Sequence, residues 1–351
     1  MDVSYSFVDY GESLAAQPGT IILDVGFKTV PGVIDHHHPE AEPECTASLL
    51  AKSPGLVLNH LRPVDLHKEQ GEFGRLRIIT HRLPDFDAIA SIFLTLKVLE
   101  LGRVDRGMAK IAAYTKLVDS ASLPPLSDLA ATPYAILRAL FAGAKKDETE
   151  INLDRVAEGL KLMRFLHAKT EEGFEMMENR FLFKGIDRYE KAMRKAADDY
   201  FWYLQDLRRS RMITAHLPLA SAEGRKLVDG LIIHNPSSFL LKEWARRDRA
   251  NSSLRKGFSL ILSNFGNERY TLGVDPESGV NFRGLADILN ARESGRRTAL
   301  GKPAGKVWYD GNCPLFDFRI IVSPQDRTLL THQEVADALM DFGRPVSPSI
   351  R

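Results

Sequence analysis

Short apolar runs that end in turn or polar residues recur along the first 120 positions of the chain. Three of them have the form of brief buried strands: "GTIILDVGF" (19–27), "PGVIDHHHP" (31–39) and "RLRIITHRLPDFD" (75–87). The segment that follows (87–102) has apolar residues at helical spacing, and Gly102 is typical of a helix end. Short strands mixed with helices predict an α/β fold with a mainly parallel sheet.

The middle of the chain has a different pattern. Residues 151–211 are dense in helix formers and in charges of both signs, which predicts one or two long helices that connect two domains. The aromatic side chains of this stretch are expected to pack, and a base-stacking platform is the alternative interpretation.

Strand-like runs return after residue 212, and helices are predicted within 237–250 and 280–295. These runs are "RMITAHLPLA", "LVDGLIIHNP", "GFSLILSNFG", "RYTLGVDP" and "FDFRIIVSP". We therefore predict a first α/β domain (1–150), a helical connector (151–211) and a second, smaller α/β domain (212–351).

Composition limits the classes of partner. The chain has 351 residues, 44% of them hydrophobic, and 47 basic residues balance 46 acidic ones. This balance gives no general attraction to nucleic acid or anionic membranes, so an anionic substrate needs a local basic patch or a metal. Cys45 and Cys313 form no CxxC pair, and the start of the chain has no signal-peptide pattern. With no apolar run near the ~20 residues of a membrane span, we expect a cytoplasmic protein.

The stretch "VIDHHHPEAE" (33–42) places an aspartate and three histidines in a row directly after an apolar run. On its own it could be a solvated loop, a tag-like cluster or part of a metal site. A second stretch, "THRLPDFDAIAS", favours the metal site because it carries His81, Asp85 and Asp87 at a strand-to-helix turn. Imidazole and carboxylate oxygen are ligands of divalent metals such as Mn²⁺. Asp85 and Asp87 could serve neighbouring ions, with one of them bridging.

Further candidate ligands follow other apolar runs. Asp24 ends the first predicted strand, and Asp35 with His36 ends the second. Asp119 follows the apolar part of "AAYTKLVDSASL". In α/β sheets ligands bind beyond the carboxyl ends of the strands. A ligand set of this mix and size suits two metal ions roughly 3.5–4 Å apart, which is the usual apparatus for activating water against a phosphate ester or anhydride.

These motifs resemble those of the DHH phosphoesterase superfamily. The superfamily includes manganese-dependent inorganic pyrophosphatases, exopolyphosphatases, single-strand exonucleases and hydrolases of short oligonucleotides or cyclic dinucleotides. "HRLPDFDAIAS" is similar to its first motif, "IILDVG" to the second, "VIDHHHP" to the third and "YTKLVDS" to the fourth. The resemblance covers about residues 19–122 and implies a metal-binding catalytic domain within 1–150 and a substrate-binding domain within 212–351.

The resemblance also implies a role for each motif residue. The implied ligands of two Mn²⁺ ions, with Mg²⁺ or Co²⁺ as alternatives, are Asp24, His36, His81, Asp85, Asp87 and Asp119. Asp35 is implied to orient His36, and His37 is implied to contact the phosphate and to take part in proton transfer. Two features depart from the family pattern: the motif order is second, third, first, fourth, which we interpret as a permuted fold, and the glycine-rich GGGH-type motif is absent.

Basic residues of the second domain are candidates for holding the substrate. Arg283 lies at a strand-to-helix junction, where its guanidinium suits bidentate phosphate recognition. Arg296, Arg297 and Lys302 lie in "SGRRTALGKPAGK" (294–306), which is either an anion-binding loop or a solvated loop. This segment is not a P-loop, because a proline follows the lysine where Ser or Thr should bind Mg²⁺.

The sequence thus predicts a metal-dependent hydrolase that uses two-metal activation of water. The expected substrates are a small phosphorylated molecule, a pyrophosphate-like anhydride or a short oligonucleotide. One alternative is a catalytically degenerate protein that keeps the fold and binds a nucleotide or metal as a regulator. Another is a structural protein whose long helices (151–211) form a homodimer interface, and dimerisation could also coexist with hydrolysis.

Overall fold

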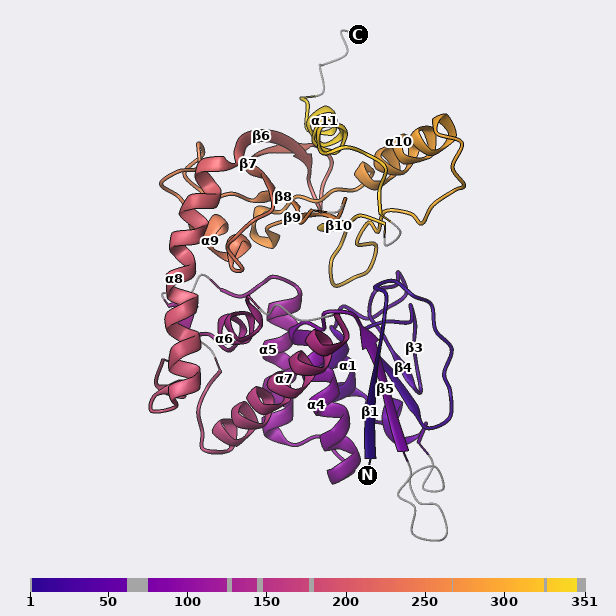
Figure 1. Cartoon of the computed structure of the whole chain (residues 1–351), viewed down its shortest axis with the longest axis vertical. Helices are drawn as coiled ribbons and strands as arrows, with labels where there is room; N and C mark the ends of the chain where they lie inside the picture. The colour runs from indigo at the N-terminus through magenta and orange to yellow at the C-terminus, as the bar shows by residue number, and fades with distance from the viewer. Residues whose placement is uncertain are drawn as a thin grey trace. The chain divides into compact units, whose positions relative to one another are not determined.

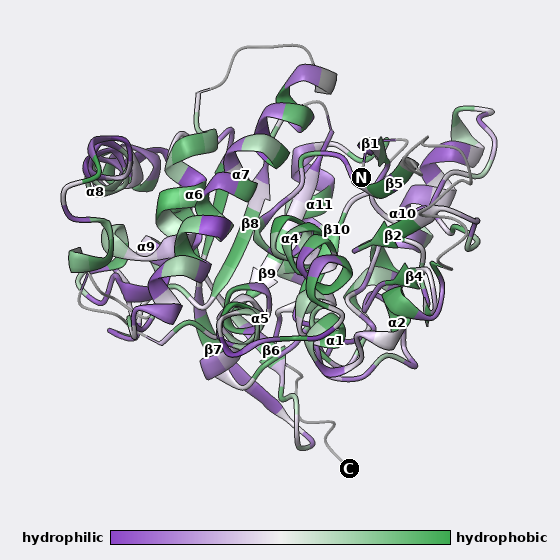
Figure 2. Ribbon diagram, turned by 90° about the horizontal axis from the view of Figure 1, so that it is seen from below, coloured by the Kyte–Doolittle hydropathy of each residue, from purple (hydrophilic) through white to green (hydrophobic). Residues whose placement is uncertain are grey.

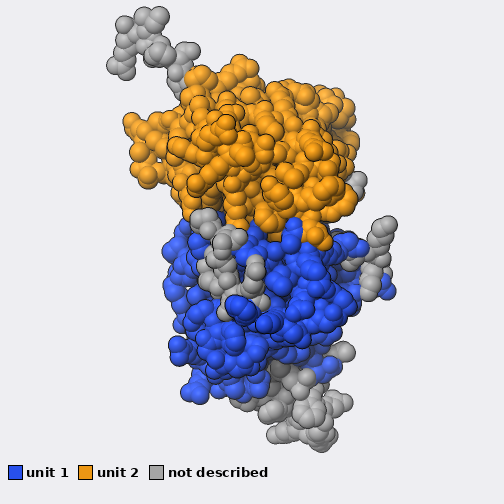
Figure 3. Space-filling model, turned by 90° about the vertical axis from the view of Figure 1, so that its left-hand side faces the viewer, with its two compact units in different colours: residues 1–197, 313–315 blue, residues 198–312, 316–351 orange. Residues whose placement is uncertain are grey.

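The computed structural model describes residues 2–61, 75–124, 128–143, 148–176, 180–266, 268–324 and 327–345. The chain divides into two compact units, which are coloured separately in Figure 3. Unit 1 comprises residues 1–197 and 313–315, and unit 2 comprises residues 198–312 and 316–351.

The division between the units falls inside helix α8 (Asp187–Arg209). Helix α7 (Glu148–Glu171) packs against α4 (Phe86–Leu101) and α5 (Arg106–Asp119) within unit 1. Two long helices are therefore present where one or two were expected, but only α8 continues from one unit into the other. The domain boundaries at 150 and 211 stay predictions, because compactness alone does not establish which segments fold independently.

Unit 1 is built on a five-stranded sheet with the order β1-β5-β2-β4-β3 (Figure 1). Its strands are β1 (Asp2–Val8), β2 (Thr20–Leu23), β3 (Thr29–Val30), β4 (Val33–Ile34) and β5 (Arg75–His81). The β1–β5, β5–β2 and β2–β4 pairs are parallel, and the β4–β3 pair at the edge is antiparallel. The prediction of a mainly parallel sheet is thus confirmed. Strands β2 and β4 are buried along their whole length, which is typical of parallel strands covered on both faces.

Helices pack against this sheet, and three of the described ones, α4, α5 and α6, begin at a side chain that caps the helix. Besides α4, α5 and α7, unit 1 contains α1 (Thr46–Lys52), α2 (Gly55–Leu58), α6 (Pro133–Phe141) and the 3₁₀ turns Leu129–Ala131 and Arg180–Phe183. Helix α4 begins at the N-cap Asp85, whose carboxylate accepts a hydrogen bond from the Ala88 amide at 3.1 Å. It ends at Gly102, which is left-handed (φ 67°), as the sequence predicts.

Unit 2 contains a second five-stranded sheet, with the order β10-β9-β8-β7-β6. Its strands are β6 (Arg211–Pro218), β7 (Arg225–His234), β8 (Leu260–Asn264), β9 (Tyr270–Val274) and β10 (Ile320–Val322). Only the β7–β8 pair is parallel, and the β6–β7, β8–β9 and β9–β10 pairs are antiparallel. The five predicted strand runs of this region are therefore confirmed, and the molecule is a mixed α/β protein with one mostly parallel sheet.

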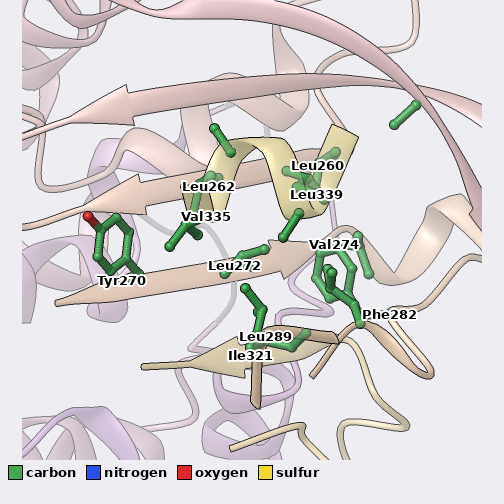
Figure 4. Packing of buried hydrophobic residues seen from close by; sticks show 14 of the residues in the cluster. Leu260, Leu262, Tyr270, Leu272, Val274, Phe282, Leu289, Ile321, Val335 and Leu339 are labelled. Atoms are coloured by element: carbon green, nitrogen blue, oxygen red, sulfur yellow. The ribbon is translucent and has the colours of Figure 1, made fainter. Parts of the chain in front are cut away.

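Alternation along β7 and β8 sends apolar side chains to both faces of the unit 2 sheet. On one face, Leu260 and Leu262 pack in a cluster with residues of α10 (Leu285–Ala299) and α11 (His332–Phe342), which Figure 4 shows from close by. On the other face, Leu231 and Ile261 pack with residues of α8 and α9 (Leu241–Arg247). Each fully buried leucine of this kind contributes roughly 1.5–3 kcal/mol, so both helix layers are held firmly to the sheet.

Hydropathy distinguishes the layers. Strands β2 and β4 are coloured as hydrophobic in Figure 2, whereas most of α8 is coloured as hydrophilic.

Among the described helices, none combines the length and the apolar character that crossing a membrane requires.

Candidate metal centre

The carboxyl ends of three neighbouring strands in unit 1 carry the polar residues of the motifs. Asp24 directly follows β2, Asp35 directly follows β4, and His81 is the last residue of β5. Because these strands are parallel and adjacent, their ends meet at one edge of the sheet. Helix α4 begins at the same edge and brings Asp87 in its first turn. The fold therefore gathers motif residues that lie as far apart in the sequence as Asp24 and Asp87.

Asp24 lies at the centre of this cluster, and its two carboxylate oxygens face different groups. Oδ1 lies 3.5 Å from Nδ1 of His36. Oδ2 lies 3.3 Å from Nε2 of His81, which is in turn 3.9 Å from Oδ1 of Asp85. Asp24 is thus the carboxylate that faces both groups, and the bridging of two ions by Asp85 or Asp87 that the sequence suggested stays a prediction.

The backbone at Asp24 is specialised for this position. Asp24 has a left-handed conformation (φ 60°), which aspartate tolerates better than most residues. Two residues later Gly26 has φ 119°, and a Cβ atom there would lie 2.6 Å from Cγ1 of Val33. The chain can therefore turn sharply at the end of β2 and point a short carboxylate along the edge of the sheet.

His36 gathers the second group of ligands. Its Nε2 lies 3.1 Å from Oδ2 of Asp119, the last residue of α5, and its Nδ1 lies 3.8 Å from Oδ2 of Asp87. Oδ2 of Asp119 is buried and has no hydrogen-bond partner in the described part of the chain. An oxygen that faces an imidazole nitrogen in this way is suited to share a cation with it.

Thr46, at the start of α1, is a site residue that the sequence analysis missed. Its amide and that of Ala47 donate to the two carboxylate oxygens of Asp87, at 2.8 Å and 2.9 Å. Its hydroxyl donates to Oδ1 of Asp24 at 3.0 Å and lies 3.2 Å from Nδ1 of His36. Thr46 thus fixes three of the predicted ligands at once. No local sequence motif indicates this role of Thr46, because the role depends on where α1 packs in the folded chain.

Asp35 orients a different histidine from the one predicted. Its Oδ1 lies 2.6 Å from Nδ1 of His37 and accepts the His37 amide at 3.1 Å, and its Oδ2 accepts the Phe27 amide at 2.7 Å. Asp35 thus orients His37, because an Asx-type turn brings its carboxylate to the residue two positions on, and the orientation of His36 by Asp35 stays a prediction. Nε2 of His37 is in hydrogen-bond contact with the hydroxyl of Tyr10, a second residue that the sequence analysis missed.

His81 is held on both sides of its ring. Its Nδ1 is 2.9 Å from the carbonyl oxygen of Arg82, which requires a proton on Nδ1 and leaves Nε2 directed at Asp24. The ring of Tyr10 contacts the rings of both His81 and His37 edge-on, each at 5.0 Å between centroids. These contacts set the orientation of the two imidazoles relative to the carboxylates.

Crowding of like charges shifts the pKa values of the cluster. Burial, with the charges of Asp24 and neighbouring carboxylates, raises the pKa values of Asp87 and Asp119 well above the usual range. Burial alone would also raise the pKa of Asp24, but the hydrogen bond and charge of His81 and the other imidazoles lower it below the usual range. Burial opposes protonation of His81, yet its hydrogen bond to Asp24 and the charge of Asp85 raise the pKa of His81 to about 9. Without a cation, the cluster therefore holds protons to limit its own repulsion.

The residues of this cluster fit a divalent metal. Three groups of ligand atoms lie close enough to one another to hold an ion: Asp24–His81–Asp85, His36–Asp87–Asp119 and Asp24–Asp35–His36–His37. Buried carboxylate oxygens and imidazole nitrogens are the donors that such ions prefer, and a cation would relieve the repulsion that raises the pKa values. A further group elsewhere in unit 1 consists of Asp105, His167 and Glu171. There Asp105 caps α5 and accepts from His167, so the pair already has a structural role.

The substrate-binding candidates all lie in unit 2, in different surroundings. Arg283 is exposed, lies 4.6 Å from the centroid of the Phe318 ring and pairs with Asp317 at 3.5 Å. Lys302 is exposed as well. Helix α10 extends to Ala299, so Arg296 and Arg297 lie on its last turns and the expectation of a loop at these two residues was wrong.

Arg297 is mostly buried and serves the packing of unit 2. Its Nε donates to Glu293 at 2.9 Å, one helical turn earlier, and its Nη2 donates to the carbonyl oxygen of Arg327 at 3.1 Å. Glu293 also accepts the Leu329 amide at 3.0 Å. These hydrogen bonds account for the burial of Arg297 without any substrate. The binding of a substrate by Arg297 stays a prediction.

Comparisons with known proteins identify no relative. No family model, no curated protein and no solved structure matches the chain.

Proposed function

We propose that the protein is a metal-dependent phosphohydrolase of the DHH phosphoesterase type. The observation that carries the proposal is the position of Asp24, whose two oxygens face two separate groups of candidate ligands. A shared carboxylate between two such sets is the arrangement that a two-metal site requires. The proposed substrates are a small phosphorylated molecule, a pyrophosphate-like anhydride or a short oligonucleotide.

The ligands divide into two sets around Asp24. His81 and Asp85 would hold one ion with Asp24, and the other ion would take His36 together with Asp87 and Asp119. The mixture of imidazole and carboxylate favours Mn²⁺, and Mg²⁺ or Co²⁺ would also suit it. When bound, a pair of divalent ions lowers the pKa of water and neutralises charge that develops on a phosphate group.

The other residues of the site prepare the ligands and move protons. Thr46 and the amide of Ala47 keep Asp87 in place, so that its carboxylate need not reorganise when charge changes nearby. The imidazole of His37 lies between Asp35 and the Tyr10 hydroxyl, which fixes the direction of both ring nitrogens. We assign to His37 the contact with the phosphate and the transfer of a proton, with Asp35 and Tyr10 as its positioning residues.

The motifs support the same assignment. The stretches around Asp24, Asp35, His81 and Asp119 resemble the four motifs of the superfamily, and each contributes a member of the cluster. Their altered order along the chain is compatible with a common site, because ligands need only meet in space. Exposed basic side chains of unit 2, among them Arg283 and Lys302, remain candidates for holding the non-reacting part of the substrate.

The test combines a hydrolysis screen with one substitution. Purified protein with Mn²⁺ is assayed on pyrophosphate, a chromogenic phosphomonoester and a chromogenic phosphodiester. Asp24→Asn should lower turnover by on the order of 10³-fold, because loss of the shared ligand forfeits several kcal/mol of charge stabilisation. The matched control is Asp105→Asn, which alters the other Asp–His pair while keeping a good helix cap. Bound Mn²⁺ without turnover on any substrate would support the regulatory alternative, and loss of Mn²⁺ binding only in Asp105→Asn would contradict the proposed centre.

A further inference from the structure

Helix α8 exposes the aromatic side chains of Phe201 and Trp202 beside a tyrosine that it buries. Phe201 and Trp202 are 56% and 50% exposed, whereas the next residue, Tyr203, is completely buried in the core of unit 2. Tyr203 therefore packs as expected for the aromatic residues of 151–211, whereas Phe201 and Trp202 do not. Exposed aromatic surface of this size is costly unless something covers it.

The two exposed rings form one end of a groove on unit 2. The groove has a volume of about 580 Å³ and is lined by Phe201, Trp202, Gln205, Arg208, Arg209 and Ser237. The rings are 5.5 Å apart between centroids and stand at 77° to each other, so they form a corner with two aromatic walls. The helical residues of the lining recur at intervals of three to four, which places them on one face of α8.

The opposite end of the groove is cationic. Arg208 is exposed, and in the described part of the chain no hydrogen bond or ion pair engages its guanidinium. Arg209 is fixed beside it, because its guanidinium pairs with the buried Asp206 carboxylate and its Nη2 donates to the carbonyl oxygen of Asn235 at 2.7 Å and to Oγ of Ser237 at 2.9 Å. Arg208 therefore supplies the uncompensated positive charge of this end. One exposed guanidinium and one held by hydrogen bonds thus lie within two turns of the aromatic corner.

We infer that this groove binds single-stranded nucleic acid, with a base stacked on Trp202 or Phe201 and a phosphate on Arg208. Aromatic faces interleaved with arginine form the usual platform for single strands, since every base offers a π-face and every nucleotide a negative charge. The volume lies within the range of small-ligand sites and suits one nucleotide unit rather than a flat protein contact. The charge of the whole chain is balanced, so this local pairing of rings and guanidinium would provide the attraction.

The inference narrows the substrate class of the proposed function to short oligonucleotides, and to that extent it rests on the proposed function. Binding itself requires no metal. A binding assay in EDTA therefore separates the two: failure of Mn²⁺-dependent hydrolysis and failure of oligonucleotide binding are independent results.

The experiment measures fluorescence anisotropy of labelled single-stranded DNA and RNA of about ten nucleotides, a length within the usual site sizes, with the full chain in EDTA. Trp202→Ala should weaken binding by about 5- to 150-fold, which corresponds to about 1–3 kcal/mol for removal of one stacking partner. Arg208→Ala should weaken it less and lower the slope of log K against log salt by about 0.7, as loss of one phosphate contact predicts. Phe265→Ala and Arg249→Ala are matched controls, because both residues are exposed in unit 2 and lie outside the groove.

Three results would overturn the inference. The first is that the wild-type chain binds neither oligonucleotide. The second is that Trp202→Ala and Arg208→Ala bind as tightly as the two controls. The third, read by sedimentation velocity, is that Trp202→Ala turns a dimer into a monomer and leaves oligonucleotide binding unchanged, which would make this face a protein interface.

Discussion

Buried aspartates occur in both units, but their partners differ. In unit 1, burial and the nearby charge of Asp24 raise the pKa values of Asp87 and Asp119. In unit 2, Asp199 and Asp206 lie two turns apart on α8, and each faces hydrogen-bond donors of the same segment. The two sets have the same chemistry and similar burial, so the difference lies in what surrounds them.

The unit 2 carboxylates are satisfied by the protein. Asp206 accepts the Ser237 and Ser238 amides, each at 2.8 Å, and Asp199 accepts the Phe239 and Leu240 amides, each at 3.0 Å. Burial raises the pKa of Asp199, and these hydrogen bonds oppose the rise. The main causes of the shift are burial and these donors. Together the two aspartates fix residues 237–240 against α8, which is a structural task.

The unit 1 carboxylates are only partly satisfied in this way. Asp87 has its amide donors, but the pKa values of Asp87 and Asp119 rise also because other carboxylates are close. Burial alone therefore does not mark a functional aspartate. The informative sign is a carboxylate that is buried next to other carboxylates, because only a bound cation or a proton removes the repulsion between them.

The largest expected effect in this comparison is on unit 2. Asp206→Asn should lower the free energy of unfolding by about 2–4 kcal/mol, because it leaves buried amide donors facing an amide nitrogen. Urea unfolding followed by tryptophan fluorescence measures this directly, since Trp202, Trp244 and Trp308 all belong to unit 2. The loss should be the same with and without Mn²⁺. Asp198→Asn, an exposed change on the same helix, should stay within about 0.5 kcal/mol.

The second effect is on unit 1 and depends on metal and pH. In EDTA, the raised pKa of His81 adds stability that is complete below its ordinary value near 6.5 and is lost as the pH rises through about 9. The raised pKa values of Asp87 and Asp119 act in the same direction, because their ionisation at higher pH disfavours the folded state.

Thermal unfolding followed by calorimetry should therefore show a falling stability in EDTA between pH 6.5 and 9. Mn²⁺ at a hundred times its Kd should restore about 2.7 kcal/mol, and its affinity should grow with pH as the ligands lose protons. An unfolding free energy in EDTA that does not change between pH 6.5 and 9 would contradict the idea that the carboxylates of the cluster repel one another when no cation is bound.

The smallest effect has the opposite sign to that of Asp206→Asn. Asp119→Asn should raise the free energy of unfolding in EDTA at neutral pH by about 1 kcal/mol, a common size for the relief of an unfavourable charge, because it removes a carboxyl group that must either repel its neighbours or hold a proton. The same variant should bind Mn²⁺ at least about tenfold more weakly. A loss of stability in EDTA would place Asp119 with the structural aspartates of unit 2.

Much of the fold could be predicted because it follows local patterns. The runs before Asp24 and Asp35 are apolar and short, and the helix that follows Asp85 has a cap at each end. Strand β1 was missed although Val3, Tyr5 and Phe7 alternate with polar residues, because this weak pattern belongs to an edge strand that is only partly buried. Its pairing with β5 is a long-range contact that no local signal specifies.

The candidate ligands of the site could be predicted from the sequence, but the residues that hold those ligands in place could not. Spacing identifies His81, Asp85 and Asp87 together, since one turn holds all three. Tyr10 and Thr46 have no such spacing and reach the site through the docking of separate segments. Which histidine Asp35 orients depends on a turn of the backbone rather than on the order of residues.

The left-handed backbone of Asp24 restricts what any engineered version of this centre could contain. Glycine, asparagine and aspartate accept this conformation readily, whereas other side chains cost roughly 1–2 kcal/mol. Glutamate, which looks like the closest substitute, would carry that cost and also extend its oxygens by one methylene. Attempts to retune the metal preference would therefore have more freedom at the histidines than at this carboxylate.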